Sequence, residues 1–291
     1  MPLEPLTSAA LRAAELNTQT RELTTYGSHR QRVMELIGIA VQGLPNAQAA
    51  SLAILGAGNC LDVDLKTLAG QFQRIELLDL DRAALEYALA MQSSDEINSE
   101  GLPVVRLIAP FDFAQPLTQL RADDIRDPSQ VSRLCESLQA PLSGLPCTPC
   151  DVVVSTCMLS QLISPLAMLA TEQHPNFAAY LQSLRRGHFR RMLQLLKPGG
   201  QAIFICDLVS SETTPALHQI PDADLPRLLA QCLSTGNFFS GLNPGVVLQD
   251  LQTQPTLSEH LRDIQILPPW RWKMGPRTYA VYAIVFTASA K

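Results

Sequence analysis

The chain has 291 residues, of which 46% are hydrophobic and 17% are charged, and its formal net charge is −5. This composition is typical of a globular protein and excludes a chain that stays disordered. The acidic balance does not favour binding to nucleic acid, and no hydrophobic stretch reaches the ~20 residues that span a membrane. The first residues lack the basic segment and hydrophobic run of a signal peptide, so we expect a cytoplasmic protein.

Residues 8–43 have a helical pattern. One hydrophobic face recurs at helical spacing, formed by Val33, Leu36, Ile37, Ala40 and Val41. Gly43 and Pro45 predict the end of this helix. We therefore expect residues 1–46 to form a helical cap on a domain that spans residues 47–291.

From residue 51 the pattern changes to short hydrophobic runs that alternate with helices. Strands are predicted at 51–55, 74–80, 104–108, 151–155 and 201–207. Helical segments lie between them, for example at 82–91 and 177–196. This alternation predicts an α/β fold with a doubly wound, mostly parallel sheet covered by helices on both faces.

Two stretches depart from this alternation and are interpreted as insertions. Residues of about 114–150 are polar, with one predicted helix near 128–138. Residues of about 209–268 are rich in loop signals and are predicted to hold short helices such as 225–233. The following β-prone run at 278–286 is expected to join the sheet as an antiparallel strand.

Seven cysteines are scattered along the chain, and Cys147 and Cys150 form a single CxxC motif. A structural zinc site usually needs four ligands, and no second CxxC or close pair of histidines accompanies this one. We predict no metal site and interpret the motif as a loop that enters a strand, with a redox or metal role as the alternative. The basic run at 185–191 is interpreted as the solvated face of a helix.

The segment 55–63 carries the first chemical signal, because a strand runs directly into a glycine-rich turn. Gly56 and Gly58 lack Cβ atoms, so the backbone can turn sharply and approach a ligand closely. A helix after such a turn offers unpaired N–H groups at its start. A tight turn without a ligand is the alternative.

Asp79 closes the next predicted strand, 21 residues after Gly58. An acid at this place can accept hydrogen bonds from both hydroxyls of a ribose held over the turn. Asp79 could instead be a helix N-cap or a surface acid, and Asp81 could cap the next helix.

The order of these motifs resembles the class I S-adenosylmethionine-dependent methyltransferases over residues of about 50–207. Segments 52–63, 77–81, 110–113, 151–159 and 195–201 are similar to the family's motifs in the same order. The resemblance implies a Rossmann-like seven-stranded sheet and S-adenosylmethionine as the cofactor. It implies cofactor-binding roles for Gly56, Ala57, Gly58, Asp79, Leu80, Asp112, Phe113, Ser155 and Thr156.

The sequence departs from the family pattern at two places. Ala53 and Ile54 stand where the family's first strand usually carries an acid, and Cys60 stands at the usual third glycine. The acid would hold the amino group of the cofactor's methionine part. These departures keep open the alternative of a non-catalytic S-adenosylmethionine- or S-adenosylhomocysteine-binding or regulatory protein.

The cap is expected to close the site, because an N-terminal helix often covers the cofactor in related enzymes. Residues 26–30 are predicted to interrupt the helical pattern, and a surface turn is the alternative. By this analogy Tyr26, His29 and Arg30 are candidates for contact with the cofactor. Arg30 could pair with the cofactor carboxylate.

The resemblance implies direct in-line methyl transfer to a small molecule by a monomer or a homodimer. Residues 157–176 and 209–275 are expected to wall the acceptor site, with aromatic residues at 237–243 and 269–272. We assign no catalytic residue, since a general base is needed only for some acceptors. Its candidates are His188, His174, Asp207 and Tyr26.

Two other ligand classes are disfavoured. The segment 155–158 lacks the Asn/Asp-Pro-Pro-aromatic motif of amino-directed DNA methyltransferases, so a nucleic-acid substrate is not expected. A nicotinamide-dependent oxidoreductase would need glycine where Leu61 stands.

Overall fold

The structure is a computed structural model, which describes residues 5–20, 27–92, 104–113, 125, 127–170 and 172–290. In these residues one sheet of seven strands has the order β3-β2-β1-β4-β5-β7-β6. Strands β1 to β5 are parallel, and β7 is antiparallel to both β5 and β6. The strands are β1 (Ser51–Leu55), β2 (Arg74–Leu78), β3 (Val104–Ile108), β4 (Cys150–Thr156), β5 (Leu196–Ser210), β6 (Leu261–Met274) and β7 (Arg277–Ala288).

The sheet confirms the predicted α/β fold with a mostly parallel sheet and an antiparallel last strand. Strands β1 and β3 have the predicted bounds. Strand β6 was not predicted, because Pro268 and Pro269 interrupt its β-prone pattern. Prolines are tolerated there because β6 lies at the edge of the sheet and its pairing shifts register between Leu267 and Trp270.

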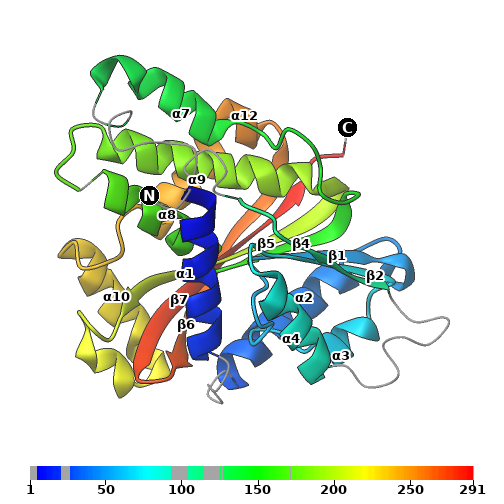
Figure 1. The fold of residues 1–291 in the computed structure, drawn as a ribbon. Coiled ribbons are helices and arrows are strands. Elements are labelled where there is room, and N and C mark those ends of the chain that lie inside the picture. The colour runs from blue at the N-terminus through cyan, green and yellow to red at the C-terminus, as the bar shows by residue number, and fades with distance from the viewer. Residues whose placement is uncertain are drawn as a thin grey trace.

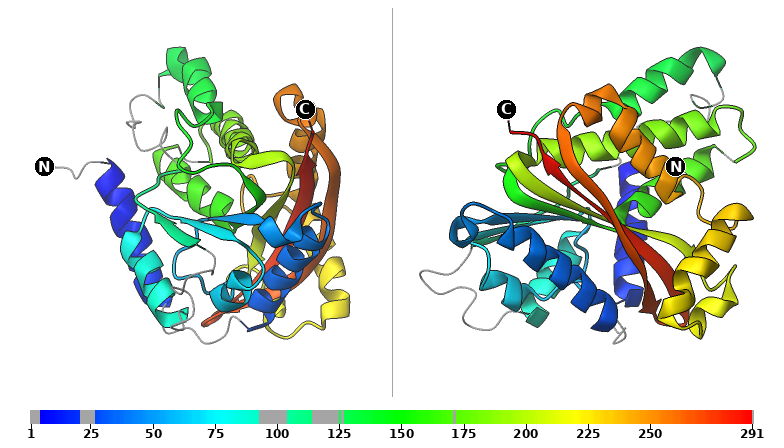
Figure 2. Two further views of the ribbon diagram at one scale, coloured as in Figure 1. Left: turned by 90° about the vertical axis from the view of Figure 1, so that its right-hand side faces the viewer. Right: turned by 180° about the vertical axis from the view of Figure 1, so that it is seen from behind.

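Helices cover both faces of the sheet, as expected for a doubly wound fold (Figures 1 and 2). Leu52 and Ile54 of β1 face a core formed with α2, α3 and α4, whereas Ala53 and Leu55 face a core formed with α7, α8 and α9. These helices are α2 (Gly27–Gln42), α3 (Leu65–Ala69), α4 (Arg82–Gln92), α7 (Val131–Gln139), α8 (Met158–Leu169) and α9 (Phe177–Gln194).

The remaining helices belong to the N-terminal and C-terminal parts of the chain. Helix α1 (Pro5–Thr20) crosses in front of the central strands (Figure 1). Helices α10 and α11 lie beside the long β6–β7 hairpin. The remaining elements are α10 (Leu225–Ser234), α11 (Pro244–Thr253) and α12 (Pro255–Ser258), with 3₁₀ turns at Ala47–Ala49, Pro128–Gln130, Pro215–His218 and Asp222–Asp224.

The N-terminal region is helical, as the sequence predicted. Helix α2 begins at Gly27, so the expectation that residues 27–30 interrupt the helical pattern is wrong. A glycine costs a helix only about 1 kcal/mol relative to alanine, so Gly27 does not prevent α2 from beginning here. The predicted face of α2 packs into the core of the sheet. The division of the chain at residue 46 stays a prediction.

The structure also corrects the interpretation of the basic run on α9 as a solvated face. Arg185 and Arg191 are only 3% and 2% exposed. The Arg185 guanidinium pairs with Asp250 of α11, with Nε 2.6 Å from Oδ2. Arg191 donates to the carbonyl oxygens of Phe113 and Leu138. These partners lie far away in the sequence, so a local pattern could not reveal that the two cations are buried.

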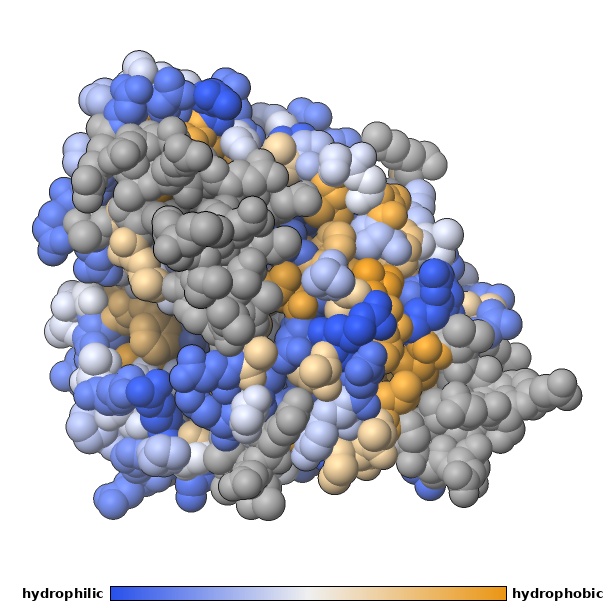
Figure 3. All heavy atoms as spheres, viewed as in Figure 1, coloured by the Kyte–Doolittle hydropathy of each residue, from blue (hydrophilic) through white to orange (hydrophobic). Residues whose placement is uncertain are grey.

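The surface around α1 combines hydrophilic and hydrophobic residues. Figure 3 shows a hydrophobic group right of centre on this face, next to hydrophilic residues. Among the described residues, no helix has the length and hydrophobicity needed to cross a membrane.

Candidate functional site

The glycine turn after β1 is held by hydrogen bonds to the neighbouring strand β2. The N–H groups of Gly56 and Ala57 both donate to the carbonyl oxygen of Leu78, at 2.9 and 3.2 Å. Gly56 and Gly58 have φ angles of +68° and +48°, which side chains with a Cβ rarely adopt. Cys60, at the family's third glycine, is also in the left-handed region with φ at +51°. The turn therefore keeps a glycine-like backbone although its third glycine is missing.

Asp79 joins the end of β2 to this turn. Its Oδ2 accepts from the N–H of Gly58 and its Oδ1 from the N–H of Asp81, each at 2.8 Å. Burial raises the pKa of Asp79, and these two hydrogen bonds oppose the increase. Asp81 accepts from the N–H of Ala84 in the first turn of α4, at 3.2 Å. Asp81 is thus the residue that caps α4, and Asp79 is neither a helix cap nor a surface acid.

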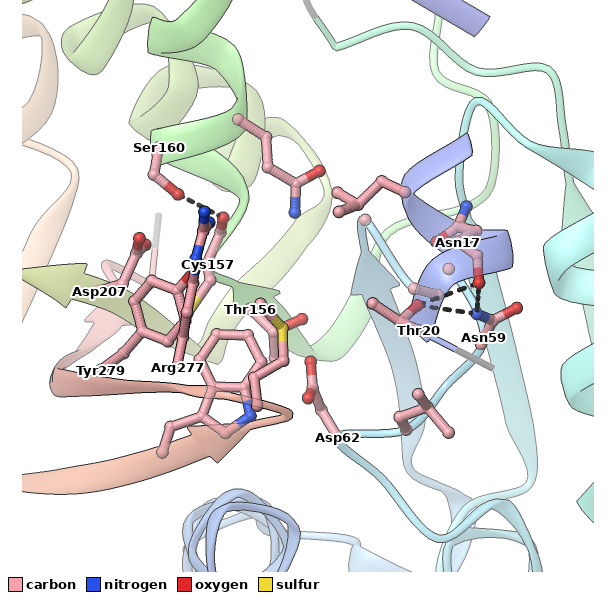
Figure 4. Close-up of a pocket in the computed structure, with 18 residues that line it drawn as sticks. Asn17, Thr20, Asn59, Asp62, Thr156, Cys157, Ser160, Asp207, Arg277 and Tyr279 are labelled. Carbon is pink, nitrogen blue, oxygen red and sulfur yellow. Dashed lines mark hydrogen bonds between the residues drawn. The ribbon is translucent and has the colours of Figure 1, made fainter. Parts of the chain in front are cut away.

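Helix α1 is attached to the turn by polar contacts. Asn17 donates from Nδ2 to Oδ2 of Asp81, at 3.0 Å. Asn59 donates from Nδ2 to the carbonyl oxygen of Asn17 at 2.6 Å and to the hydroxyl of Thr20 at 3.2 Å (Figure 4). Helix α1 therefore lies against the glycine turn and lines the candidate site, whereas closure of the site by the whole cap stays a prediction.

A first cavity, the Asp79 cavity, lies between the ends of β2 and β3 and helix α8. Its empty volume is about 910 Å³, part of which is open to solvent. The structure brings five of the predicted residues together here. They are Gly56, Asp79, Leu80, Asp112 and Phe113, joined by Leu16, Phe111, Met158, Gln161, Leu162 and others.

A second cavity, the Asp207 cavity, adjoins the first, because both are lined by Leu16, Gly56 and Gln161. Its empty volume is about 840 Å³. It contains the predicted residues Gly56, Ala57, Gly58 and Thr156, and it adds Asn17, Asn59, Asp62, Cys157, Ser160, Asp207, Trp272, Arg277 and Tyr279 among others. Figure 4 shows Asp207, Tyr279 and Arg277 on one side, the Asn17–Thr20–Asn59 group on the other, and Asp62 between them.

Two carboxylates give the Asp207 cavity its chemical character. Burial raises the pKa of Asp207 to about 6, and hydrogen bonds with Ser160 and Cys157 oppose the increase. One oxygen of Asp207 has no hydrogen-bond partner among the described residues. Asp62 Oδ1 is also buried, and it lies 3.4 Å from Nε2 of His29. The cavity can therefore bind a cationic group or accept a proton.

Sequence reasoning did not assign a role to Asp62 or Tyr279. Asp62 belongs to the motif segment 55–63, which could have drawn attention to it. Trp272 and Tyr279 come from β6 and β7, and their rings lie 5.3 Å apart between centroids. Trp272 falls within the aromatic segment 269–272 that was expected to wall the acceptor site. The aromatic residues at 237–243 do not line either cavity in the described part of the chain.

Two of the predicted cofactor-binding residues, Arg30 and Ser155, do not line the cavities in the described structure. Tyr26 lies outside the described residues. Arg30 donates from Nε to the carbonyl oxygen of Leu61, at 2.8 Å, and so supports the loop after the turn. Ser155 is fully buried, and its hydroxyl is 3.0 Å from Nε2 of His188.

The described candidate general bases differ in whether they line a cavity. His188 is buried between α9 and the sheet, and burial lowers its pKa to about 3, so it stays neutral. His174 accepts from the N–H of Asn176 just before α9, away from both cavities. His29, which was a candidate for contact with the cofactor and not for the base, is buried and stacks on Trp272. Asp207 is the candidate that lines a cavity.

No protein-family model matches the sequence, and no curated protein matches it significantly. Among solved structures, the chain is similar to the N-methyltransferase NodS from Bradyrhizobium japonicum in complex with S-adenosylhomocysteine, with 13% identity over 98% of both chains and a TM-score of 0.42. It is similar to a SAM-dependent methyltransferase from Methanosarcina mazei, with 10% identity over 87% of this chain and 98% of the other, at a TM-score of 0.44.

A third similar structure is a SAM-dependent methyltransferase from Leishmania major, with 13% identity over 95% of this chain and 82% of the other, at a TM-score of 0.45. Three features of the fold are observed directly in this chain: the strand order, the antiparallel β7 and the glycine turn after β1. In that seven-stranded, Rossmann-like fold the chain resembles the class I S-adenosylmethionine-dependent methyltransferase superfamily.

Proposed function

We propose that this chain is an S-adenosylmethionine-dependent methyltransferase that acts on a small molecule by direct in-line methyl transfer. The observation that carries this proposal is that two cavities meet at Gly56, one on each side of the glycine turn. A cofactor that lies across the turn would have its nucleoside in one cavity and its reactive end in the other. A methyl acceptor could then approach from the second cavity.

The residues of the Asp79 cavity fit a nucleoside. The Asp79 carboxylate has acceptor positions beyond the two that the backbone uses, and ribose hydroxyls can donate to them. Leu80 and Phe113 offer hydrophobic contact for a base, and Asp112 offers an acceptor for an exocyclic amino group. The lining is mostly hydrophobic with a few polar groups, which is typical of small-molecule sites.

Asp62 is the residue that we expect to bind the amino group of the cofactor's methionine part. The family's usual acid is replaced by Ala53 and Ile54, both of which are buried in the cores of the sheet. Asp62 follows the glycine turn and lines the cavity on the other side of Gly56 from the nucleoside. A carboxylate there can pair with an ammonium group, so this chain would use a different residue for the same contact.

The sulfonium of the cofactor supplies an activated methyl group, and the protein supplies placement. Correct orientation alone can lower a barrier by up to ~7–11 kcal/mol in the best intramolecular reactions. Asp207 can accept a proton from an acceptor that must lose one, because its raised pKa makes it a stronger base than an ordinary carboxylate. Trp272 and Tyr279 would form the aromatic wall against which the acceptor packs.

Isothermal titration with S-adenosylmethionine and S-adenosylhomocysteine tests the cofactor site. We expect micromolar binding that Asp79→Ala weakens at least about tenfold, which corresponds to ~1.4 kcal/mol. Glu136→Ala, an exposed acid on α7, is the matched control and should bind as the wild type does. The absence of heat and of a thermal shift in folded protein would overturn the proposal, and binding of NAD in its place would indicate an oxidoreductase.

A screen of small-molecule acceptors then separates an enzyme from a binding protein. Formation of S-adenosylhomocysteine that depends on the acceptor would support the enzyme. Tight cofactor binding without turnover on any amine, hydroxyl, thiol or carbon acid in the screen would favour the non-catalytic alternative.

A further inference from the structure

The CxxC motif lies at the opposite end of the sheet from the two cavities. Cys150 is the first residue of β4, and Cys147 lies in the preceding loop. Both side chains are buried, and the Sγ of Cys150 donates to the carbonyl oxygen of Thr148 within the motif, at 3.6 Å. Both cysteines are free thiols. The fold therefore holds both thiols within one short, buried segment at the start of β4.

Arg74, the first residue of β2, fixes the geometry of this loop. Its guanidinium donates to the carbonyl oxygens of Thr148 and Pro149, at 3.2 and 3.1 Å, and lies 3.7 Å from Sγ of Cys150. The same guanidinium pairs with the fully buried Glu76, at 2.9 Å. A cation thus lies beside the thiol of Cys150 in a loop held by hydrogen bonds, and a neighbouring cation is one feature of the surroundings of reactive cysteines.

The two thiols differ in acidity. The interaction with Cys150 lowers the pKa of Cys147, and the charges of Arg74 and Arg106 act in the same direction, whereas burial and the charge of Glu76 oppose it. The same pairing, together with burial, raises the pKa of Cys150. Cys147 is flanked by exposed residues of the loop at Leu145 and Thr148. Cys147 is therefore the thiol that a reagent would meet first as a thiolate.

We propose that Cys147 and Cys150 form an oxidisable dithiol that closes to a disulfide by exchange with a small disulfide such as oxidised glutathione. The Cys147 thiolate attacks one sulfur of the reagent, and one glutathione thiolate leaves. Cys150 loses its proton to solvent and attacks Sγ of Cys147, and the second glutathione thiolate leaves. The protein loses two protons and two electrons, and the reagent is reduced to two thiols.

A metal does not explain the motif equally well. Within the part of the chain that the structure describes, no group of three or more His, Cys, Asp or Glu side chains is placed to hold a metal ion. Cys147 and Cys150 alone would provide two ligands, whereas structural zinc takes four. The dithiol proposal needs only these two residues and does not depend on the proposed methyltransferase activity.

Intact mass and peptide mapping of the native protein, after incubation with oxidised and reduced glutathione at several ratios, test the proposal. We expect the wild type to lose the mass of two hydrogens and to yield one peptide pair linked through Cys147 and Cys150. Cys135→Ser, on the neighbouring helix α7, is the matched control and should behave as the wild type does. Retention of all seven free thiols by folded wild-type protein under oxidising ratios would overturn the proposal.

Single substitutions identify the attacking sulfur. In Cys150→Ser the mixed disulfide with glutathione should accumulate on Cys147, because the resolving thiol is absent. Cys147→Ser should give no adduct on Cys150 at the same ratios. An adduct found mainly at another cysteine would contradict the assignment. Circular dichroism of each variant shows whether it is folded, and the wild-type mapping decides the proposal if a variant is not.

Discussion

The carboxylate of Asp79 accepts a hydrogen bond from the backbone N–H of Gly58 at 2.8 Å, and so joins the end of β2 to the turn that follows β1. This contact lets one residue shape the turn and face the Asp79 cavity at the same time. The two adjacent parallel strands end at the same edge of the sheet, which is where ligands bind in open α/β folds.

Asp79→Ala should destabilise the protein even without a ligand. The substitution leaves the buried N–H groups of Gly58 and Asp81 without their acceptor, and each such loss costs about 1–3 kcal/mol. We expect the free energy of unfolding to fall by at least about 1 kcal/mol in urea denaturation. The Glu136→Ala control should change by less than about 0.5 kcal/mol. Equal stability of the two variants would show that the contact does not hold the turn.

Asp62→Asn should distinguish binding at the amino-acid end of the proposed cofactor site from binding at the nucleoside end. If Asp62 pairs with the amino group, the variant should bind S-adenosylhomocysteine about tenfold more weakly, or ~1.4 kcal/mol. Methylthioadenosine lacks the amino-acid part, so its affinity should not change. Asp79→Ala should weaken binding of both compounds. Loss of both affinities in Asp62→Asn would instead indicate that Asp62 supports the turn.

Asp207 should give the protein a pH-dependent stability. Because burial raises its pKa to about 6, the folded state holds this proton more tightly than the unfolded chain, where an aspartate has a pKa of about 3.9. The contribution of Asp207 to stability is therefore lost as the pH rises from about 4 to about 6. Above pH ~6 the free energy of unfolding is therefore lower by about 3 kcal/mol than it is below pH ~4, because Asp207 is then ionised in the folded state.

Asp207→Asn should remove this dependence. We expect the variant to gain stability over the wild type between about pH 5 and pH 8 in urea denaturation. If Asp207 is also the proton acceptor, the rate of methyl transfer in the wild type should rise with pH through about 6, and the variant should lack that limb. An identical pH dependence of stability in both proteins would contradict the assigned pKa.

Gly187→Ala should disturb the packing of α7 on α9. A Cβ atom at Gly187 would lie 1.9 Å from the carbonyl oxygen of Leu138, so the backbone of one helix must move. Overpacking of this kind costs about 1–3 kcal/mol, which exceeds the ~1 kcal/mol that alanine gains over glycine in a helix. Thermal unfolding should show a lower midpoint. Gly144→Ala, which has no atom within 4 Å of the added Cβ, is the control.

Much of the fold could be predicted because its signals are local. The hydrophobic runs of β1 and β3 and the glycine turn depend on neighbouring residues, and the predicted strand bounds at 51–55 and 104–108 are those of the structure. The spacing from Gly58 to Asp79 is a local signal too, because β1 and β2 are neighbours in the sheet and are joined by a short crossover. Local periodicity and turn chemistry are therefore sufficient for this part.

The tertiary structure alone decided which distant side chains meet. Asp62 and Asp207 share a cavity with Tyr279 because β1, β4, β5 and β7 are adjacent in the sheet, although their segments are far apart in the sequence. Arg185 is buried because α11 supplies Asp250, and β6 forms at an edge that accepts its prolines. The sequence by itself determined the glycine turn and its acid. Only the pairing of strands and helices determined the rest of the site, because the free energy of burial depends on non-local partners.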